Sequence, residues 1–163
     1  MFNISTFLKK LRNLGIPERK LLEWFPPFWF MGVKVRVVAA DYRFAEIRVP
    51  LRWYGKNLYG SMFGGWISSA TDPVPALLTE RYFSQRLGKE VHAWTKSHKV
   101  TFLKPSRSEI AYTVYVENAD IAEIEPTLRE KGQVDHLFHF PVYDSRERIV
   151  AEVENTVFLR VAV

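Results

Sequence analysis

The sequence contains no cysteine and no long hydrophobic run. With 0 Cys among 163 residues, the chain can form no disulfide, has no thiolate nucleophile and offers no cysteine-bound metal site. No stretch reaches the ~18 consecutive apolar residues that a membrane-spanning helix needs. Lys9, Lys10 and Arg12 interrupt the apolar segment near the N-terminus, which is unlike a secretory signal. We therefore expect a cytoplasmic protein.

Linkers and internal repeats are absent as well. The 8 glycines and 9 prolines are spread along the chain apart from the pair Pro26-Pro27, and no segment repeats. A hydrophobic content of 47% with 25% charged residues is typical of a folded globular chain. We expect an N-terminal helical extension over residues 1–27 and one folded domain over residues 28–163.

Acidic residues are outnumbered, since 23 Lys and Arg stand against 18 Asp and Glu and give a net charge of +5. A basic chain favours anionic partners such as nucleic acid, an anionic membrane or the phosphates of coenzyme A. The basic residues are dispersed and no nucleic-acid-binding motif accompanies them, so we expect no nucleic acid partner. The aromatic run of residues 24–31 follows a cationic amphipathic segment, so membrane surface contact is an alternative to packing in the core or against a second subunit.

Hydrophobic periodicity predicts an α+β domain. Apolar residues recur at helical spacing in some segments and alternate with polar residues in others. The helical segments are residues 4–14, 17–25, 64–87 and 120–132, and the strands include residues 33–39, 45–49, 110–116 and 153–161. The first half of the longest helix is nearly all apolar or small, so this helix must be enclosed. The pattern predicts a sheet wrapped round one long buried helix.

Two prolines interrupt the long helix. Pro73 and Pro75 predict a kink or break near Asp72, because proline lacks the helical N–H and restricts the residue before it. The aromatic run of residues 24–31 is expected to be a buried loop.

The helical insert is expected to carry no chemistry. Asp120 is a candidate cap for its first turn, and Pro126 is a candidate start for a second helix. Its acidic residues are expected to be solvated: Glu123, Glu125 and Glu130.

Residues 57–65, Asn-Leu-Tyr-Gly-Ser-Met-Phe-Gly-Gly, form the one stretch whose spacing indicates chemistry. The first N–H groups of a helix are unpaired and carry partial positive charge, so Gly64-Gly65 at a helix start is suited to hold a developing oxyanion. Asp72 places a carboxylate on the same apolar helix, where it needs a partner or a cleft. The alternative is structural, with a loop-to-helix joint at the glycines and a local N-cap at Asp72.

This pattern, Asn-x-x-Gly-x-x-[His]-Gly-Gly with an acid seven residues on, resembles the active-site signature of hot-dog-fold acyl-CoA thioesterases of the phenylacetate-pathway type. The chain matches it at Asn57, Gly60, Gly64, Gly65 and Asp72. Residues 100–105 resemble the strand and turn that follow the family's central helix, and residues 51–53 and 70–73 are similar to an uncharacterised, thioesterase-like branch of the superfamily. The resemblance runs from about residue 28 to the C-terminus and implies an antiparallel hot-dog sheet.

The resemblance also implies a thioester hydrolase whose site is shared between subunits. It places the N–H of Gly65 against the thioester carbonyl and gives Asp72 of one chain the role of orienting or deprotonating water. Asn57 of the neighbouring chain would position substrate or water. Thr95 stands where the family often carries a Ser or Thr facing the site, and it would support the intermediate by a hydrogen bond. The expected assembly is a homodimer or a dimer of dimers, with coenzyme A as part of the substrate and no separate cofactor.

One position departs from the family pattern. Phe63 stands where the family has His, so the hydrogen bond of that imidazole is lost. One alternative is therefore a non-catalytic acyl- or lipid-binding protein. A second alternative, a membrane-peripheral interaction protein, rests on the N-terminal helical segment instead. Phe63 and Gly64 are expected to contact the substrate, and Lys104 and Arg107 the phosphates of coenzyme A.

Neither a metal site nor a serine hydrolase is indicated. His136 and His139, three residues apart in an expected strand, should point to opposite faces. His92 and His98 are expected on one side of a strand but too far apart for one ion. The Gly-x-Ser-x-Gly elbow of a serine hydrolase is missing.

Overall fold

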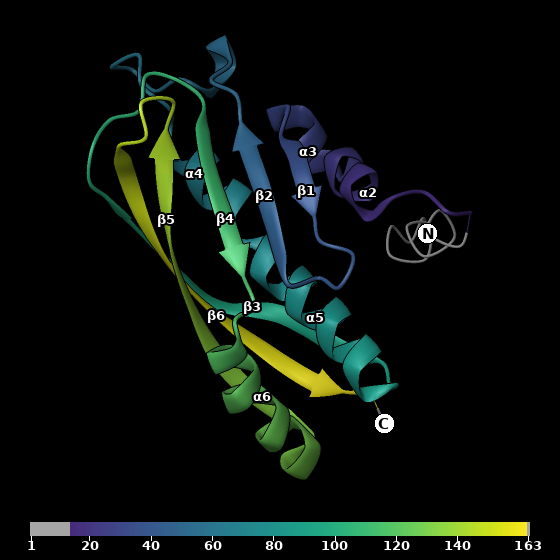
Figure 1. Ribbon diagram of the computed structural model, residues 1–163. Helices are drawn as coiled ribbons and strands as arrows, with labels where there is room; N and C mark the ends of the chain where they lie inside the picture. Colours follow the sequence, from purple (N-terminus) through teal and green to yellow (C-terminus); the bar gives the residue numbers. More distant parts are fainter. Residues whose placement is uncertain (1–13, 163) are drawn as a thin grey trace, which may run out of the picture.

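One antiparallel sheet and two helices laid against it organise the chain (Figure 1). The computed structural model describes residues 14–162. The strands are β1 Lys34–Val38, β2 Phe44–Val49, β3 Val91–Phe102, β4 Ile110–Tyr115, β5 Gln133–Asp144 and β6 Ile149–Val161. The helices are α2 Glu18–Trp24, α3 Pro26–Met31, α4 Gly64–Thr71, α5 Pro73–Leu87 and α6 Asn118–Lys131, with a 3₁₀ turn η1 at Trp53–Gly55. The first expected helix, residues 4–14, lies outside the described residues except for its last member.

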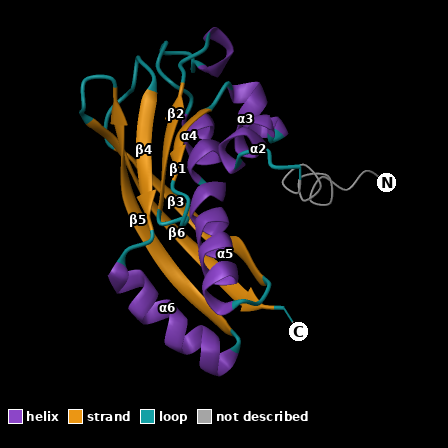
Figure 2. Ribbon diagram, turned by 45° about the vertical axis from the view of Figure 1, so that its right-hand side comes forward, coloured by secondary structure: helices purple, strands orange, loops and turns teal. Residues whose placement is uncertain are grey.

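The sheet has the order β1-β2-β4-β5-β6-β3, and each neighbouring pair is antiparallel. Figure 2 shows α4 and α5 lying end to end along one face of it. Alternate residues of the strands turn their side chains to this face and are buried, as in the row Val153, Asn155, Val157 and Leu159 of β6. The expected α+β architecture, a sheet wrapped round a central helix with a helical segment before it, is confirmed.

The central helix is interrupted at Asp72, as the prolines predict. α4 ends at Thr71 and α5 begins at Pro73, whose ring provides no N–H for the helical ladder. Asp72 itself keeps helical torsion angles, φ −65° and ψ −54°, but its side chain makes no capping hydrogen bond. The residue therefore occupies an N-cap position without acting as a cap.

A β-bulge in β3 overturns one prediction. The pairing of β3 with β6 shifts register between Thr95 and Ser97, so the inward and outward alternation of side chains reverses there. His92 is exposed, whereas His98 turns toward the helix side of the sheet. The prediction that these two histidines share one side of the strand is wrong because a strict two-residue period does not hold across a bulge.

The aromatic run of residues 24–31 is helical, so the expected loop is wrong. Pro26 opens α3, because proline suits the first helical turn, and Gly32 ends it with a positive φ of 71°. Phe28 is fully buried. Phe30 packs on Tyr54 of η1, with ring centroids 5.4 Å apart. The run thus connects the N-terminal helices to the loop that precedes α4.

The insert forms the single helix α6 rather than two. Glu117 is its N-cap, and it makes a reciprocal capping box with Asp120, while Pro126 lies inside the helix. Glu125 is not simply solvated, because it accepts hydrogen bonds from Arg86 of α5 at 3.1 Å and from Arg129 at 2.6 Å. α6 is thereby attached to the end of the central helix.

The turn between β5 and β6 is held by one carboxylate. Asp144 accepts hydrogen bonds from the backbone N–H groups of Arg146 and Arg148 and from the guanidinium of Arg148, the last at 2.6 Å. The hydrogen bonds from the Arg148 side chain lower the pKa of Asp144 to about 2.

Replacement of this carboxylate is expected to weaken the fold at neutral pH. Because the folded-state pKa lies below the ordinary value of 3.8, the charged form contributes stability above that value, and this contribution is lost as the pH falls through about 2. Asp144→Asn should therefore lower the urea unfolding midpoint at neutral pH and flatten its decline in acid. Asp135→Asn, an exposed acid of the same strand, is the control. A variant that keeps the wild-type acid response would contradict this account.

Candidate active site

The loop of residues 57–63 is shaped by one asparagine. The Oδ1 atom of Asn57 accepts hydrogen bonds from the backbone N–H groups of Tyr59, at 2.9 Å, and Ser61, at 3.2 Å. Its Nδ2 atom donates to the hydroxyl of Ser61 at 2.8 Å. Gly60 adopts a positive φ of 75° at the tip. The amide of Asn57 is thus largely committed to the loop, with one Nδ2 hydrogen left over.

The loop leads into the glycine pair at the start of α4. The N–H groups of a first helical turn have no intrahelical acceptor, and here they belong to Gly64 and Gly65. Two aromatic rings flank this tip. A Cβ at Gly64 would lie 2.9 Å from the ring of Phe102, and a Cβ at Gly65 would collide with the ring of Phe63. The glycines are needed because side chains there would displace both rings.

A groove of about 530 Å³ opens beside the tip of α4. Four of the residues predicted from the sequence line it together: Asn57, Gly64, Lys104 and Arg107. Lys104 and Arg107 are exposed, and neither has a carboxylate partner in the described part of the chain. The walls include Phe102 and Leu103, each about half exposed. The groove therefore combines apolar walls with free positive charge.

Asp72 lies at the other end of α4, away from this groove. Seven residues separate it from Gly65, which corresponds to roughly 10 Å of helical rise. Its backbone carbonyl accepts two side-chain hydrogen bonds, from Thr95 Oγ1 at 3.1 Å and from Asn155 Nδ2 at 2.9 Å. Its carboxylate has no hydrogen-bond partner among residues 14–162. Hydrogen bonds within one chain therefore hold the backbone of Asp72, whereas its carboxylate has no hydrogen-bond partner among the described residues.

Sequence reasoning missed a polar cluster under the helix break. His98 approaches Thr71 Oγ1 through Nε2 at 3.2 Å and Asn155 Nδ2 through Nδ1 at 3.1 Å. Burial lowers the pKa of His98, and the charge of Asp72 opposes this effect only in part. The sequence signal was Asn155, a lone amide in an otherwise apolar inward row of β6.

Tyr112 completes this cluster from β4. Its hydroxyl donates to the carbonyl of Ala70 at 2.5 Å, and the whole side chain is buried. Burial raises the pKa of Tyr112 well above its ordinary value, and the nearby charge of Asp72 adds to the rise. The phenol is therefore protonated at neutral pH and acts as a donor to the end of α4.

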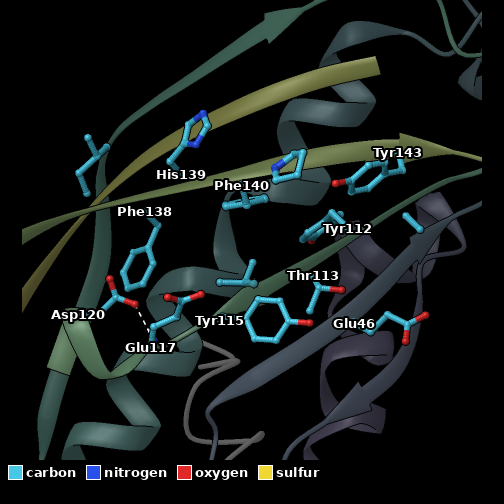
Figure 3. Close-up of a pocket in the computed structure, with 14 residues that line it drawn as sticks. Glu46, Tyr112, Thr113, Tyr115, Glu117, Asp120, Phe138, His139, Phe140 and Tyr143 are labelled. Carbon is cyan, nitrogen blue, oxygen red and sulfur yellow. Dashed lines mark hydrogen bonds between the residues drawn. The ribbon is translucent and has the colours of Figure 1, made fainter. Parts of the chain in front are cut away.

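A second hollow of about 640 Å³ lies between β4 and β5 (Figure 3). The two strands pair only at Ile110–Asp144 and Ala111–Tyr143 and then diverge. Tyr112 and Phe140 stack within it, with ring centroids 5.5 Å apart. None of the residues predicted as site residues lines this hollow, and its carboxylates are those of Glu46 and the α6 capping box.

Solved structures of similar shape identify the class of fold. A Pseudomonas aeruginosa protein of unknown function, described as a probable thioesterase, superposes with a TM-score of 0.77 at 19% identity, covering 88% of this chain and 93% of that one. The Escherichia coli PaaI protein from the phenylacetic acid degradation operon gives 0.64 at 15%, covering 88% and 89%. A Haemophilus influenzae thioesterase gives 0.66 at 10%, covering 99% and 92%. The chain has the hot-dog fold of these proteins.

The family follows from the sequence. The model of the family described as a domain of unknown function, DUF4442, matches residues 18–159, and the chain belongs to this family. A comparison with curated proteins gives no match.

The glycine tip provides a direct test of its packing. Gly65→Ala should displace the Phe63 ring and lower the free energy of unfolding, and Phe63→Ala should relieve the collision. We expect a coupling of about 0.5–1 kcal/mol between the two substitutions in a double-mutant cycle of urea unfolding. Phe102→Ala is the control, because that ring contacts Gly64 instead. Equal coupling of Gly65→Ala to both phenylalanines would contradict the arrangement.

Proposed function

We propose that this protein hydrolyses acyl thioesters. The observation that carries the proposal is the Asp72 carboxylate, which is free of hydrogen bonds on a backbone held by Thr95 and Asn155. Asp72 is half-buried, and a carboxylate withdrawn from water without a partner is costly unless it has a use. The names of two structural neighbours, a probable thioesterase and a thioesterase, support the same class of reaction.

The proposed reaction uses groups at both ends of α4. Asp72 accepts a proton from a water molecule as the water oxygen attacks the thioester carbonyl carbon. The N–H of Gly65 stabilises the oxyanion that develops on the carbonyl oxygen. The carbon–sulfur bond then breaks, and the thiol leaves with the proton that Asp72 returns. Asn57 shapes the loop and offers its remaining N–H to the substrate, while Thr95 acts by holding the carbonyl of Asp72.

Two copies of the chain are needed in this proposal. Gly65 and Asp72 are too far apart along one helix to act on one carbonyl, so the glycine tip of one subunit faces Asp72 of its neighbour. The 12-residue strand β3 lies at an edge of the sheet. An edge strand of this length presents unpaired backbone groups, which favours pairing with a second copy. We propose a homodimer, alone or within a dimer of dimers.

Coenzyme A is the proposed carrier of the acyl group and requires no further cofactor. Its phosphates suit Lys104 and Arg107 on the groove beside the tip, while Phe63 and Gly64 line the path to the carbonyl. Charge-assisted contacts to phosphate are among the stronger hydrogen bonds.

The packing of Phe63 favours a second candidate function, non-catalytic acyl binding. The ring lies against Gly65 and is 52% exposed, so it partly covers the glycine tip. A bound acyl group without turnover is the result that this function predicts. In the described part of the chain, no helix is both long and apolar enough to cross a bilayer.

Loss of the acid is expected to abolish turnover. Asp72→Asn should reduce the turnover of the best substrate in a panel of acetyl, hexanoyl, palmitoyl and phenylacetyl coenzyme A by roughly 100-fold or more, measured as release of free thiol. Stability should change little because the carboxylate makes no capping bond. Glu109→Gln, an exposed acid just before β4 that pairs with Arg48, is the control. Unchanged turnover in Asp72→Asn would refute the proposed base.

Sharing of the site can be tested by mixing subunits. Asp72→Asn and Asn57→Ala should each be inactive alone, and after unfolding and joint refolding a mixed dimer should contain one site with both native residues. With random assembly, roughly a quarter of the wild-type activity should return. Light scattering should give two or four times the 19.1 kDa chain mass. Continued inactivity of a verified mixed dimer would place both residues in a site within one chain.

A further inference from the structure

We propose that His98 and Asn155 are positioning residues for Asp72, acting together to hold the break between α4 and α5. The inference rests on the proposed function, because it assigns these residues a part in the same reaction. Neither residue touches the reacting atoms in this proposal. They act through the backbone of Asp72, and so through the direction of its carboxylate.

The proton positions in this pair follow from hydrogen-bond chemistry. A carbonyl only accepts, so the amide nitrogen of Asn155 must face the carbonyl of Asp72, at 2.9 Å. The second hydrogen of the same amide faces Nδ1 of His98, at 3.1 Å, and Nδ1 must therefore be an unprotonated acceptor. Nε2 then carries the ring hydrogen and donates to Thr71 Oγ1 at 3.2 Å. The arrangement requires a neutral imidazole.

A proton on Nδ1 of His98 would place two donors against each other. The amide of Asn155 can accept this proton only by turning its oxygen toward the ring, and that turn withdraws Nδ2 from the carbonyl of Asp72. The Oδ1 atom of Asn155 is buried and has no hydrogen-bond partner in the described part of the chain. Nothing else therefore holds the amide against the turn, and the state of the imidazole decides whether Asp72 is held by Asn155.

Burial and nearby charge together set the pH at which His98 gains a proton. The charged group that faces the ring is Asp72, and the neutral phenol of Tyr112 lies beyond it. Lys99 and Glu154, the sequence neighbours of the pair, bind each other at 2.9 Å on the other face of the sheet. Burial is the larger influence and keeps the pKa of His98 below its ordinary value of 6.5. The neutral form is thus the one present at neutral pH, and it is lost only as the pH falls below that ordinary value.

Three variants separate the contacts. Asn155→Leu removes both amide donors at similar volume. His98→Gln keeps a donor near the Nε2 position but no acceptor near Nδ1, whereas His98→Asn keeps an oxygen acceptor near Nδ1 and does not titrate. Val153→Ala, on the same inward row of β6, controls for general loosening of the core.

Kinetics with the best ester of the panel form the first arm. We expect Asn155→Leu and His98→Gln to lower kcat by roughly 10- to 100-fold with KM within about twofold, because displacement of a reacting group by about 1 Å has effects of this size. His98→Asn should keep kcat within about threefold of wild type. Its kcat should also fall less as the pH is lowered, because the titrating imidazole is gone. Val153→Ala should leave kcat near wild type. An unchanged kcat in Asn155→Leu, or an equal fall in Val153→Ala, would overturn the inference while leaving the hydrolase intact.

Nuclear magnetic resonance of the free protein forms the second arm and needs no substrate. The wild-type spectrum should show the Nε2–H tautomer of His98, and its pKa should rise in Asn155→Leu, because the neutral ring loses a donor. The chemical shift of the Asp72 carboxyl carbon should change in Asn155→Leu and should remain at its wild-type value in Val153→Ala. If the wild-type protein cleaves no ester, the proposed function fails and this arm alone decides. An Asp72 signal unaffected by Asn155→Leu would then overturn the positioning role.

Discussion

The break between α4 and α5 at Asp72 is the constraint on which the rest of the site depends. α4 ends at Thr71 and α5 begins at Pro73, and side chains of the sheet reach backbone carbonyls at this break. Tyr112 donates a hydrogen bond to the carbonyl of Ala70, while Thr95 and Asn155 both donate to the carbonyl of Asp72. Side chains from three strands, β3, β4 and β6, thereby contact one point of the helix. Their polar atoms lie away from water, and the hydrogen bonds offset the cost of burying them.

Much of the fold could be predicted because it depends on short-range rules. Alternation of apolar and polar residues located the strands, and Pro73 and Pro75 located the break in the central helix, since both signals act over a few residues. The aromatic run of residues 24–31 was mistaken for a loop, although its prolines suit a first helical turn. The insert was split because Pro126 was taken as the start of a second helix, whereas it lies inside α6.

Candidate site residues could be predicted where they are neighbours in sequence or where the resemblance supplied them. Asn57 and Gly64 share one loop and helix start, and the resemblance to a known signature added Lys104 and Arg107 to the same groove. His98 was set aside because the bulge in β3 cannot be seen in the pattern of residue types. Its contacts come from α4 and from β6, more than 20 residues away in each direction, and such pairings depend on the register of the whole sheet.

The bulge after Thr95 also places two lysines of β3 on the same, exposed face of the sheet. Lys96 and Lys99 are three residues apart, an odd spacing that a regular strand would divide between its faces, yet both reach acids on the exposed side, Asp135 and Glu154. One extra residue in the strand is what allows this. Deleting Lys96, the residue of β3 without a partner on β6, would leave a regular strand in which His98 still pairs with Asn155 and Lys99 with Glu154, so neither would change face. The bulge thus gives the exposed surface one additional cation while both rows of the strand stay in register with β6.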